Sequence, residues 1–316
     1  MRTIFFLLAL TVCSVSVCPS FAQPPDDRDR ANVRTVSIPI SIFTKQELEN
    51  KRAEEVIMAD RLTVKENKEE QTILSIRSVW DAPLSLAIVV QDDLSSGFNL
   101  HLKDLKEFIK RLPKGSRVMV AYTRGGSLQT RQKFTDDLEK AAGSVRIVTS
   151  SSGLSTRDPY DSIIDVLNRF DALPTGRRAI LFFSDGLDAS HGFDSTSPSQ
   201  SVDLDRAILR AQRRGVAVFS IWNPTELTSG QNSRLILNAQ GSLDRLSEET
   251  GGRAFFQGSI APVSLLPFFR DLGLLLNRQF LLSYLSTHMK KGYYRIEVTS
   301  SNPTVKIEHP KGYYYR

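Results

Sequence analysis

Apolar runs alternate with helical patterns through the middle of the chain. Four short, almost wholly apolar runs predict strands that are covered on both faces, at 84–90, 118–122, 179–183 and 216–221. Apolar residues recur at helical spacing in the segments 100–112, 134–142, 159–170, 204–214, 235–250 and 263–278. Because strands that alternate with helices form parallel sheets, residues 81–279 predict an α/β domain with a doubly wound, mostly parallel sheet and helices on both faces.

Period-two patterns flank this domain on both sides. In residues 33–80, apolar and polar positions alternate from Val36 to Ile42, and two further strand patterns follow the segment 45–60, where we expect a short helix. Residues 280–316 contain three more strand patterns separated by turn residues. Neither group buries much by itself, so we expect the two groups to pack together as a small β-rich segment beside the α/β domain.

The first 22 residues have the three parts of an export signal. Arg2 provides positive charge, residues 4–17 are mostly apolar, and Ser20 and Ala22 place small residues at the −3 and −1 positions of a cleavage site. A membrane anchor is the alternative, but the apolar stretch is short for a bilayer span. We expect cleavage near Ala22 and export to the periplasm or beyond, with residues 23–32 as a flexible leader.

Composition excludes several classes of protein. The hydrophobic share of 41% is that of a globular chain, which excludes disorder. The 41 lysines and arginines are intermixed with 35 aspartates and glutamates, without the basic blocks of a nucleic-acid surface. Beyond the N-terminal signal, we expect no transmembrane segment in the mature chain.

Residues that could bind a metal ion or a partner cluster where the predicted strands end. The segment 91–97 follows the first buried strand and 184–188 follows another, while 155–162 leads into a helix. All three segments are rich in carboxylates and hydroxyls, the oxygen ligands that a hard cation such as Mg²⁺ requires. Ligands bind such sheets beyond the carboxyl ends of the strands, so these segments predict the functional edge.

The order of elements and several short motifs resemble the von Willebrand factor type A (VWA) domain. More narrowly, they are similar to exported VWA proteins of acidobacteria, over residues 33–316. The motifs that carry this resemblance are Phe134–Asp137, Pro159–Ser162, Ser184–Gly186, Thr250–Arg253 and Gly312–Tyr314. The resemblance implies a doubly wound sheet that holds a divalent ion at one edge, where the carboxylate of a partner protein completes the coordination.

The resemblance also implies a ligand set, here in degenerate form. Asp185 matches the aspartate of the Ser-Asp-Gly turn, and Thr156 matches the threonine, with Ser155 as its alternate. The Asp-x-Ser-x-Ser element is incomplete in every register. A register that starts at Asp92 retains Ser96, one that starts at Asp93 retains Ser95, and one that starts at Gln91 loses the carboxylate. We favour Asp92, Ser96, Thr156 and Asp185 as ligands of Mg²⁺, with Asp93, Ser95 and Asp188 as residues that face a partner.

Other chemistry lacks its signature residues. The four histidines have no metal-site spacing, and neither a Gly-x-Ser-x-Gly elbow nor a phosphate-binding glycine loop occurs. We therefore expect an exported, non-catalytic binding protein that engages a protein or cell-surface partner through the loops 91–99, 153–160 and 184–194. The alternatives are a metal-assisted envelope hydrolase, with Asp92, Asp93, Asp185 and Asp188 around the metal, and a structural assembly subunit that pairs through its β-rich segment.

Overall fold

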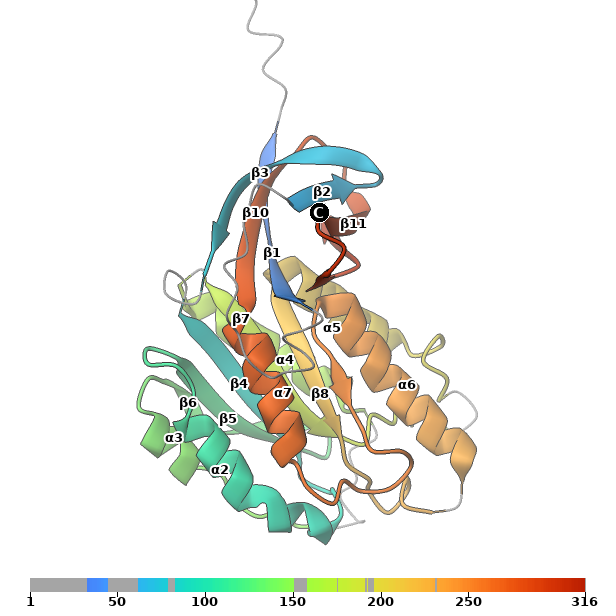
Figure 1. Ribbon diagram of the computed structural model, residues 1–316. Coiled ribbons are helices and arrows are strands. Elements are labelled where there is room, and N and C mark those ends of the chain that lie inside the picture. The colour runs from blue at the N-terminus through green and yellow to red at the C-terminus, as the bar shows by residue number, and fades with distance from the viewer. Residues whose placement is uncertain are drawn as a thin grey trace, which may run out of the picture. The chain divides into compact units, whose positions relative to one another are not determined.

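The described part of the chain contains two β-sheets, and helices cover one of them (Figure 1). The computed structural model describes residues 33–44, 62–78, 83–150, 158–174, 176–190, 192, 196–230 and 232–315. An antiparallel sheet of seven strands has the order β12-β1-β10-β3-β2-β11-β13, and a mixed sheet of six has the order β6-β5-β4-β7-β8-β9. The helix expected at 45–60 and the signal peptide lie outside the described residues.

The antiparallel sheet joins the two ends of the sequence. Its strands are β1 (Arg34–Thr44), β2 (Leu62–Glu66), β3 (Glu69–Arg77), β10 (Gln279–Ser286), β11 (Gly292–Ser300), β12 (Val305–Glu308) and β13 (Gly312–Tyr315). β1 pairs with β10 from Arg34 opposite Ser286 to Ser41 opposite Gln279. Its alternating apolar residues form one core, in which Ile38 and Ile40 of β1 pack with Leu282 of β10. Buried and more exposed residues alternate along β2 and β11, as the period-two pattern predicts, whereas β1 is buried on both faces from Ile38 to Phe43.

The mixed sheet lies between two layers of helices. Its strands are β4 (Leu84–Gln91), β5 (Arg117–Arg124), β6 (Ser127–Thr135), β7 (Arg177–Ser184), β8 (Val216–Trp222) and β9 (Ala254–Phe255). One face packs against the helices α2 (Leu102–Lys110), α3 (Leu138–Gly143) and α7 (Leu266–Asn277). The other packs against α4 (Tyr160–Arg169), α5 (Val202–Arg214) and α6 (Ser233–Thr250). Among the described helices, none is long and apolar enough to cross a membrane.

The predicted fold class is wrong in two respects. The β-rich part is no minor flank: its seven strands outnumber the six of the other sheet, and every neighbouring pair in it is antiparallel. The second sheet is mixed, because β6 runs antiparallel to β5, while β4, β5, β7, β8 and β9 run parallel. The chain is therefore not organised around a single, mostly parallel, doubly wound sheet.

The strand β6 accounts for one of these errors. Gly125 and Gly126 take positive φ angles of 55° and 77°, as a two-residue hairpin turn requires, and they return the chain along the edge of β5. The helix expected at 134–142 begins only at Leu138, where the Asp137 side chain accepts a hydrogen bond from the Lys140 N–H. A glycine pair between two alternating segments was the sequence signal for this hairpin.

Candidate functional site

The loops that follow β4, β7 and β8 are joined by backbone hydrogen bonds at the carboxyl edge of the mixed sheet. Ser95 N–H, after β4, donates to the carbonyl of Pro224 at 2.9 Å, and Asn223 N–H, after β8, donates to the carbonyl of Ser184 at 3.0 Å. Because these three strands are parallel, their ends meet at one edge. The edge therefore combines side chains from segments more than one hundred residues apart in the sequence.

Gln91, the last residue of β4, ties two of these loops together. Its Oε1 accepts hydrogen bonds from the hydroxyl of Ser184 at 2.6 Å and from the N–H of Asp185 at 3.2 Å. The turn that follows needs glycine at position 186, because a Cβ there would lie 2.5 Å from the carbonyl oxygen of Ala239 and the backbone φ is +74°. This turn fixes the position of Asp185.

The carboxylate of Asp185 is buried and bound only by neutral donors. Its side chain is 2% exposed. Oδ2 accepts the hydroxyl of Thr225 at 2.6 Å and that of Thr228 at 3.4 Å, and Oδ1 accepts the N–H of Leu187 at 3.2 Å. Burial raises the pKa of Asp185 to about 6, against the lowering effect of the Thr225 hydroxyl, and the negative charge of Asp93 raises it further.

Asp92 is engaged by two arginines. Its carboxylate accepts two hydrogen bonds from the guanidinium of Arg146, at 2.7 and 3.0 Å, and Arg124 lies 3.8 Å away. The hydrogen bond to Asp92 raises the pKa of Arg146, whose guanidinium also stacks on the Tyr122 ring at 4.1 Å. A bidentate pair of this kind fixes the orientation of a carboxylate. Asp92 therefore neutralises the charge of Arg146 and holds its guanidinium in place at this edge.

A pocket of about 240 Å³ opens beside these residues, and we call it the rim pocket. Its described lining consists of Asp93, Ser95, Ser96, Ser150, Thr225, Glu226 and Leu227. Of the residues predicted from the sequence, Asp93, Ser95 and Ser96 therefore lie together in the lining, and Asp185 is linked to it through Thr225. Asp92 is not in this lining, and Thr156 and Ser155 lie outside the described residues.

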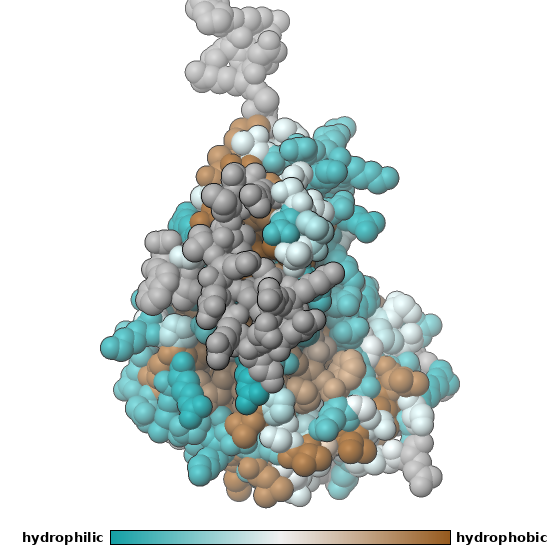
Figure 2. Space-filling model, in the orientation of Figure 1, coloured by the Kyte–Doolittle hydropathy of each residue, from teal (hydrophilic) through white to brown (hydrophobic). Residues whose placement is uncertain are grey.

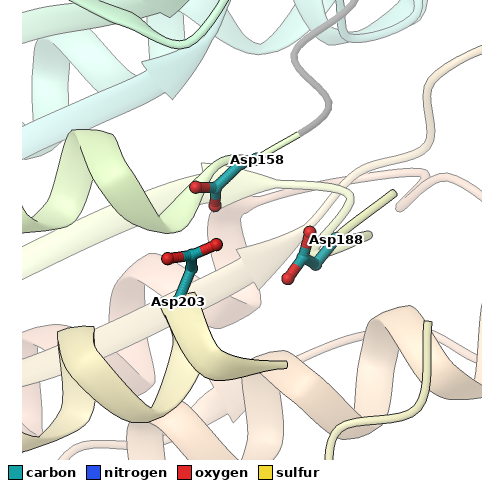
Figure 3. Close-up of side chains that lie close together, drawn as sticks. All are labelled: Asp158, Asp188 and Asp203. Atoms are coloured by element: carbon teal, nitrogen blue, oxygen red, sulfur yellow. The ribbon is translucent and has the colours of Figure 1, made fainter. Parts of the chain in front are cut away.

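Asp188 belongs to a second acidic group, with Asp158 and Asp203 (Figure 3). One carboxylate oxygen from each residue lies within 4.8 Å of the others. Burial raises the pKa of Asp158 to about 7, although the Tyr160 N–H lowers it, and the neighbouring carboxylates add to the rise. Asp188 accepts hydrogen bonds from Ser190 and Ser201, so it also shapes the loop that leads into α5.

Sequence reasoning missed the loop that follows β8. Thr225 and Glu226 line the rim pocket, and Thr228 shares the carboxylate of Asp185 with Thr225. The signal was available: polar residues follow the buried run 216–221, just as they follow the other two strands. The rule that parallel strands end at one edge applied to this loop as well.

Neither a protein-family model nor the sequence of a characterised protein matches the chain. The chain is similar in structure to VWA domains. BatB from Bacteroides thetaiotaomicron is 12% identical, with 60% of this chain and 95% of that chain covered and a TM-score of 0.42. The von Willebrand factor type A protein from Catenulispora acidiphila is 10% identical, with 89% and 72% covered and a TM-score of 0.44.

A third similar structure is proximal thread matrix protein 1 from the mussel byssus, described with a zinc-occupied MIDAS motif. It is 14% identical to this chain, with 66% of this chain and 48% of that chain covered and a TM-score of 0.41. The solved structures to which the chain is similar include two whose names give a von Willebrand factor type A or VWA domain. The narrower resemblance to acidobacterial proteins stays a prediction.

The described residues do not fit the divalent-ion site that the family resemblance implies. Oε1 of Gln91 already accepts two hydrogen bonds, which leaves only its amide nitrogen, and a nitrogen that carries hydrogens does not bind a cation. The carboxylate of Asp92 is paired with Arg146, and that of Asp185 is occupied by three donors. The described lining of the rim pocket contains two carboxylates, those of Asp93 and Glu226, beside serine and threonine hydroxyls.

Proposed function

We propose that this chain is an exported, non-catalytic binding protein of the VWA type, which contacts a protein or cell-surface partner directly through the rim pocket and the loops around it. The observation that carries this proposal is the rim pocket itself. Its described lining comes from the segment after β4, from Ser150 after α3 and from the segment after β8. These segments are tied by backbone hydrogen bonds from Ser95 N–H to the Pro224 carbonyl and from Ser150 N–H to the Asp92 carbonyl. Such an arrangement suits recognition, because its polar groups are ordered before a partner arrives.

Apolar surface near this edge supports the same function. Leu100, at the end of the short 3₁₀ helix that follows the pocket residues, is 82% exposed, and Val263 is 77% exposed. Their segments are adjacent, because the His101 ring nitrogen Nε2 lies 3.1 Å from the carbonyl oxygen of Pro262. Figure 2 shows apolar patches along the lower edge of the view. Exposed apolar groups beside a polar pocket are typical of an interaction site.

The lining of the pocket favours binding over catalysis. Among the described residues, the lining contains no histidine, cysteine or lysine, so its serines have no histidine or lysine there to activate them as nucleophiles. The proposed export depends on the N-terminal sequence pattern. The described residues of the edge do not fit a bridging Mg²⁺ ion, because Gln91 and Asp92 are already engaged by other side chains and backbone. Binding by this edge therefore depends on direct contacts from the chain's own side chains.

Site-specific photo-crosslinking in the source cells tests this function. A benzoyl-phenylalanine replaces Leu227, which lines the pocket and is 38% exposed, and a control replaces Leu237 on α6, which is 68% exposed. We expect a discrete adduct from position 227, lost when Ser95 and Ser96 are both changed to tyrosine to fill the pocket, and none from position 237. Equal labelling from both positions, or none from position 227, would contradict the proposal.

A further inference from the structure

The hairpin of β5 and β6 carries positive charge without any acidic residue of its own. Residues 117–135 contain Arg117, Arg124, Arg131 and Lys133, and no aspartate or glutamate. Arg131 and Lys133 are exposed, and neither forms an ion pair within the described part of the chain. The turn of this hairpin lies at the carboxyl edge of the mixed sheet, because β5 runs parallel to β4 and ends at Arg124.

Three arginines from separate segments meet around Tyr122 and Asp92. Arg146 holds both carboxylate oxygens of Asp92, at 2.7 and 3.0 Å, and the Nε of Arg124 lies 3.8 Å from the same carboxylate. Burial raises the pKa of Tyr122, while the positive charges of Arg146 and Arg131 act in the opposite direction, so Arg131 also lies near this ring. Guanidinium groups stay charged at neutral pH. One carboxylate among three of them therefore leaves a surplus of positive charge.

The segments beside these arginines supply little negative charge to balance the surplus. Residues 144–157, which follow α3, contain two arginines and no aspartate or glutamate. Of the acidic residues after β6, Asp137 caps α3, Glu139 pairs with a lysine of α2 at 2.9 Å, and Asp136 is exposed. Asp93 lies in the lining of the rim pocket. The field beside β6 is therefore positive and attracts negative groups.

The geometry of β6 favours contact through side chains over the addition of a further strand. β6 is the outer strand of its sheet, beside β5. Two shifts in register interrupt their pairing: Arg131 has no residue opposite it, and Lys133 and Phe134 together span the single position of Met119. Such bulges twist an edge strand and hinder its pairing with another chain. A partner would therefore meet the cationic side chains and not the backbone.

We propose that Arg124, Arg131, Lys133 and Arg146, which we call the basic patch, bind a carboxylate-rich segment of a partner protein. This surface is separate from the rim pocket and adds a second contact to the proposed binding function. The bidentate pair of Arg146 with Asp92 already shows a carboxylate held by a guanidinium fork here, and the other two arginines carry the same fork. Charge complementarity of this kind speeds the encounter of two proteins and weakens with salt.

Amide NMR titration of the ¹⁵N-labelled mature chain tests this inference with an acetylated hexaglutamate amide, and with hexaglutamine and phosphatidylglycerol vesicles as further probes. We expect hexaglutamate alone to shift the amide signals of Arg124, Arg131 and Lys133, more weakly as the salt concentration rises. R131Q/K133Q should bind it about fivefold more weakly, as the loss of two exposed ion pairs predicts. The matched control K290Q/K291Q removes the same charge from the turn between β10 and β11, and should bind as the wild type does.

Several results would overturn the inference. Absence of hexaglutamate binding, or equal weakening in K290Q/K291Q, would show that the basic patch does not recognise carboxylates. Vesicles that bind through Arg131 and Lys133 while hexaglutamate does not would assign the patch to a lipid surface. Self-association of R131Q/K133Q with unchanged hexaglutamate binding would show that these charges only protect the strand edge. The adduct from position 227 is measured independently, so the proposed function and this inference can fail separately.

Discussion

Two buried carboxylates, one in each sheet, show how differently this protein treats negative charge. Glu66 of the antiparallel sheet is fully buried. Its Oε1 accepts the hydroxyls of Tyr313 at 2.6 Å and Ser286 at 3.0 Å, and the guanidinium of Arg34 lies 3.7 Å away. Arg34 in turn stacks on the ring of Tyr315, at 3.9 Å from its centroid. A buried charge that is paired and hydrogen-bonded in this way stabilises one register of the strands.

Asp185 of the mixed sheet has no such cation in its described surroundings, where its hydrogen bonds come from neutral donors. Burial therefore raises its pKa to about 6, so its charged form costs free energy in the folded protein at neutral pH. A buried carboxylate whose charged form lowers the stability of the fold is typical of a functional site, because such sites sacrifice stability for binding. The comparison separates a structural carboxylate from one that belongs to the proposed site.

Glu66→Ala should give the largest effect, because it removes the ion-pair partner of Arg34 and the acceptor of the Tyr313 and Ser286 hydroxyls. We expect the free energy of unfolding to fall by about 4 kcal/mol in denaturant titrations. Glu69→Gln is the matched control, since the Glu69 side chain is 69% exposed, and it should change stability by less than about 0.5 kcal/mol. A loss below about 1 kcal/mol for Glu66→Ala would mean that the network does not stabilise the sheet.

Asp92→Asn tests whether the arginine-bound carboxylate of the rim is structural, as Glu66 is. The change removes the charge that holds Arg146 in a bidentate pair, and we expect a loss of about 2 kcal/mol of stability. The photo-crosslinked adduct from position 227 should be retained, because Asp92 is not in the described lining of the rim pocket. Unchanged stability together with loss of the adduct would reverse this assignment.

Asp185→Asn should act in the opposite direction and stabilise the protein. The folded pKa of about 6 lies above the unfolded value, so the charge is unfavourable above pH 6 and is relieved as protons bind between pH 6 and pH 4. We expect a gain of about 1–2 kcal/mol at pH 7.5, after allowance for weakened hydrogen bonds, that shrinks to near zero at pH 4. A gain that is independent of pH would show that the charge of Asp185 is not its cause.

His309, beside the antiparallel sheet, should produce the smallest effect. Burial lowers the pKa of this imidazole, whose Nε2 accepts the N–H of Val298 at 3.3 Å. The folded pKa lies below the unfolded one, so stability is complete above pH 6.5 and falls as the pH drops through the folded pKa. In the Asp185→Asn background, which removes the titration of Asp185, His309→Gln should make the fall in stability below pH 6.5 shallower. An unchanged pH profile would contradict this role.

Local sequence patterns predicted the elements better than their partners. The continuous apolar runs 84–90 and 179–183 lie within β4 and β7, because strands buried on both faces leave no polar positions. The alternation from Val36 to Ile42 lies within β1, but a period of two is the same for any antiparallel neighbour. The number of strands in the seven-stranded sheet, their order and their relative directions could not follow from this alternation.

The sequence by itself determined that carboxylates and hydroxyls follow the buried strands. It therefore also determined that the candidate binding site lies at the carboxyl edge of the sheet that these strands form. Only the tertiary structure decided which of two adjacent aspartates enters the rim pocket. Asp92 pairs with Arg146, 54 residues away, while Asp93 lies in the pocket lining opposite a loop that follows β8. Both residues lie in the turn after β4, where no strand period sets the direction of a side chain, so long-range partners decide which of them lines the pocket.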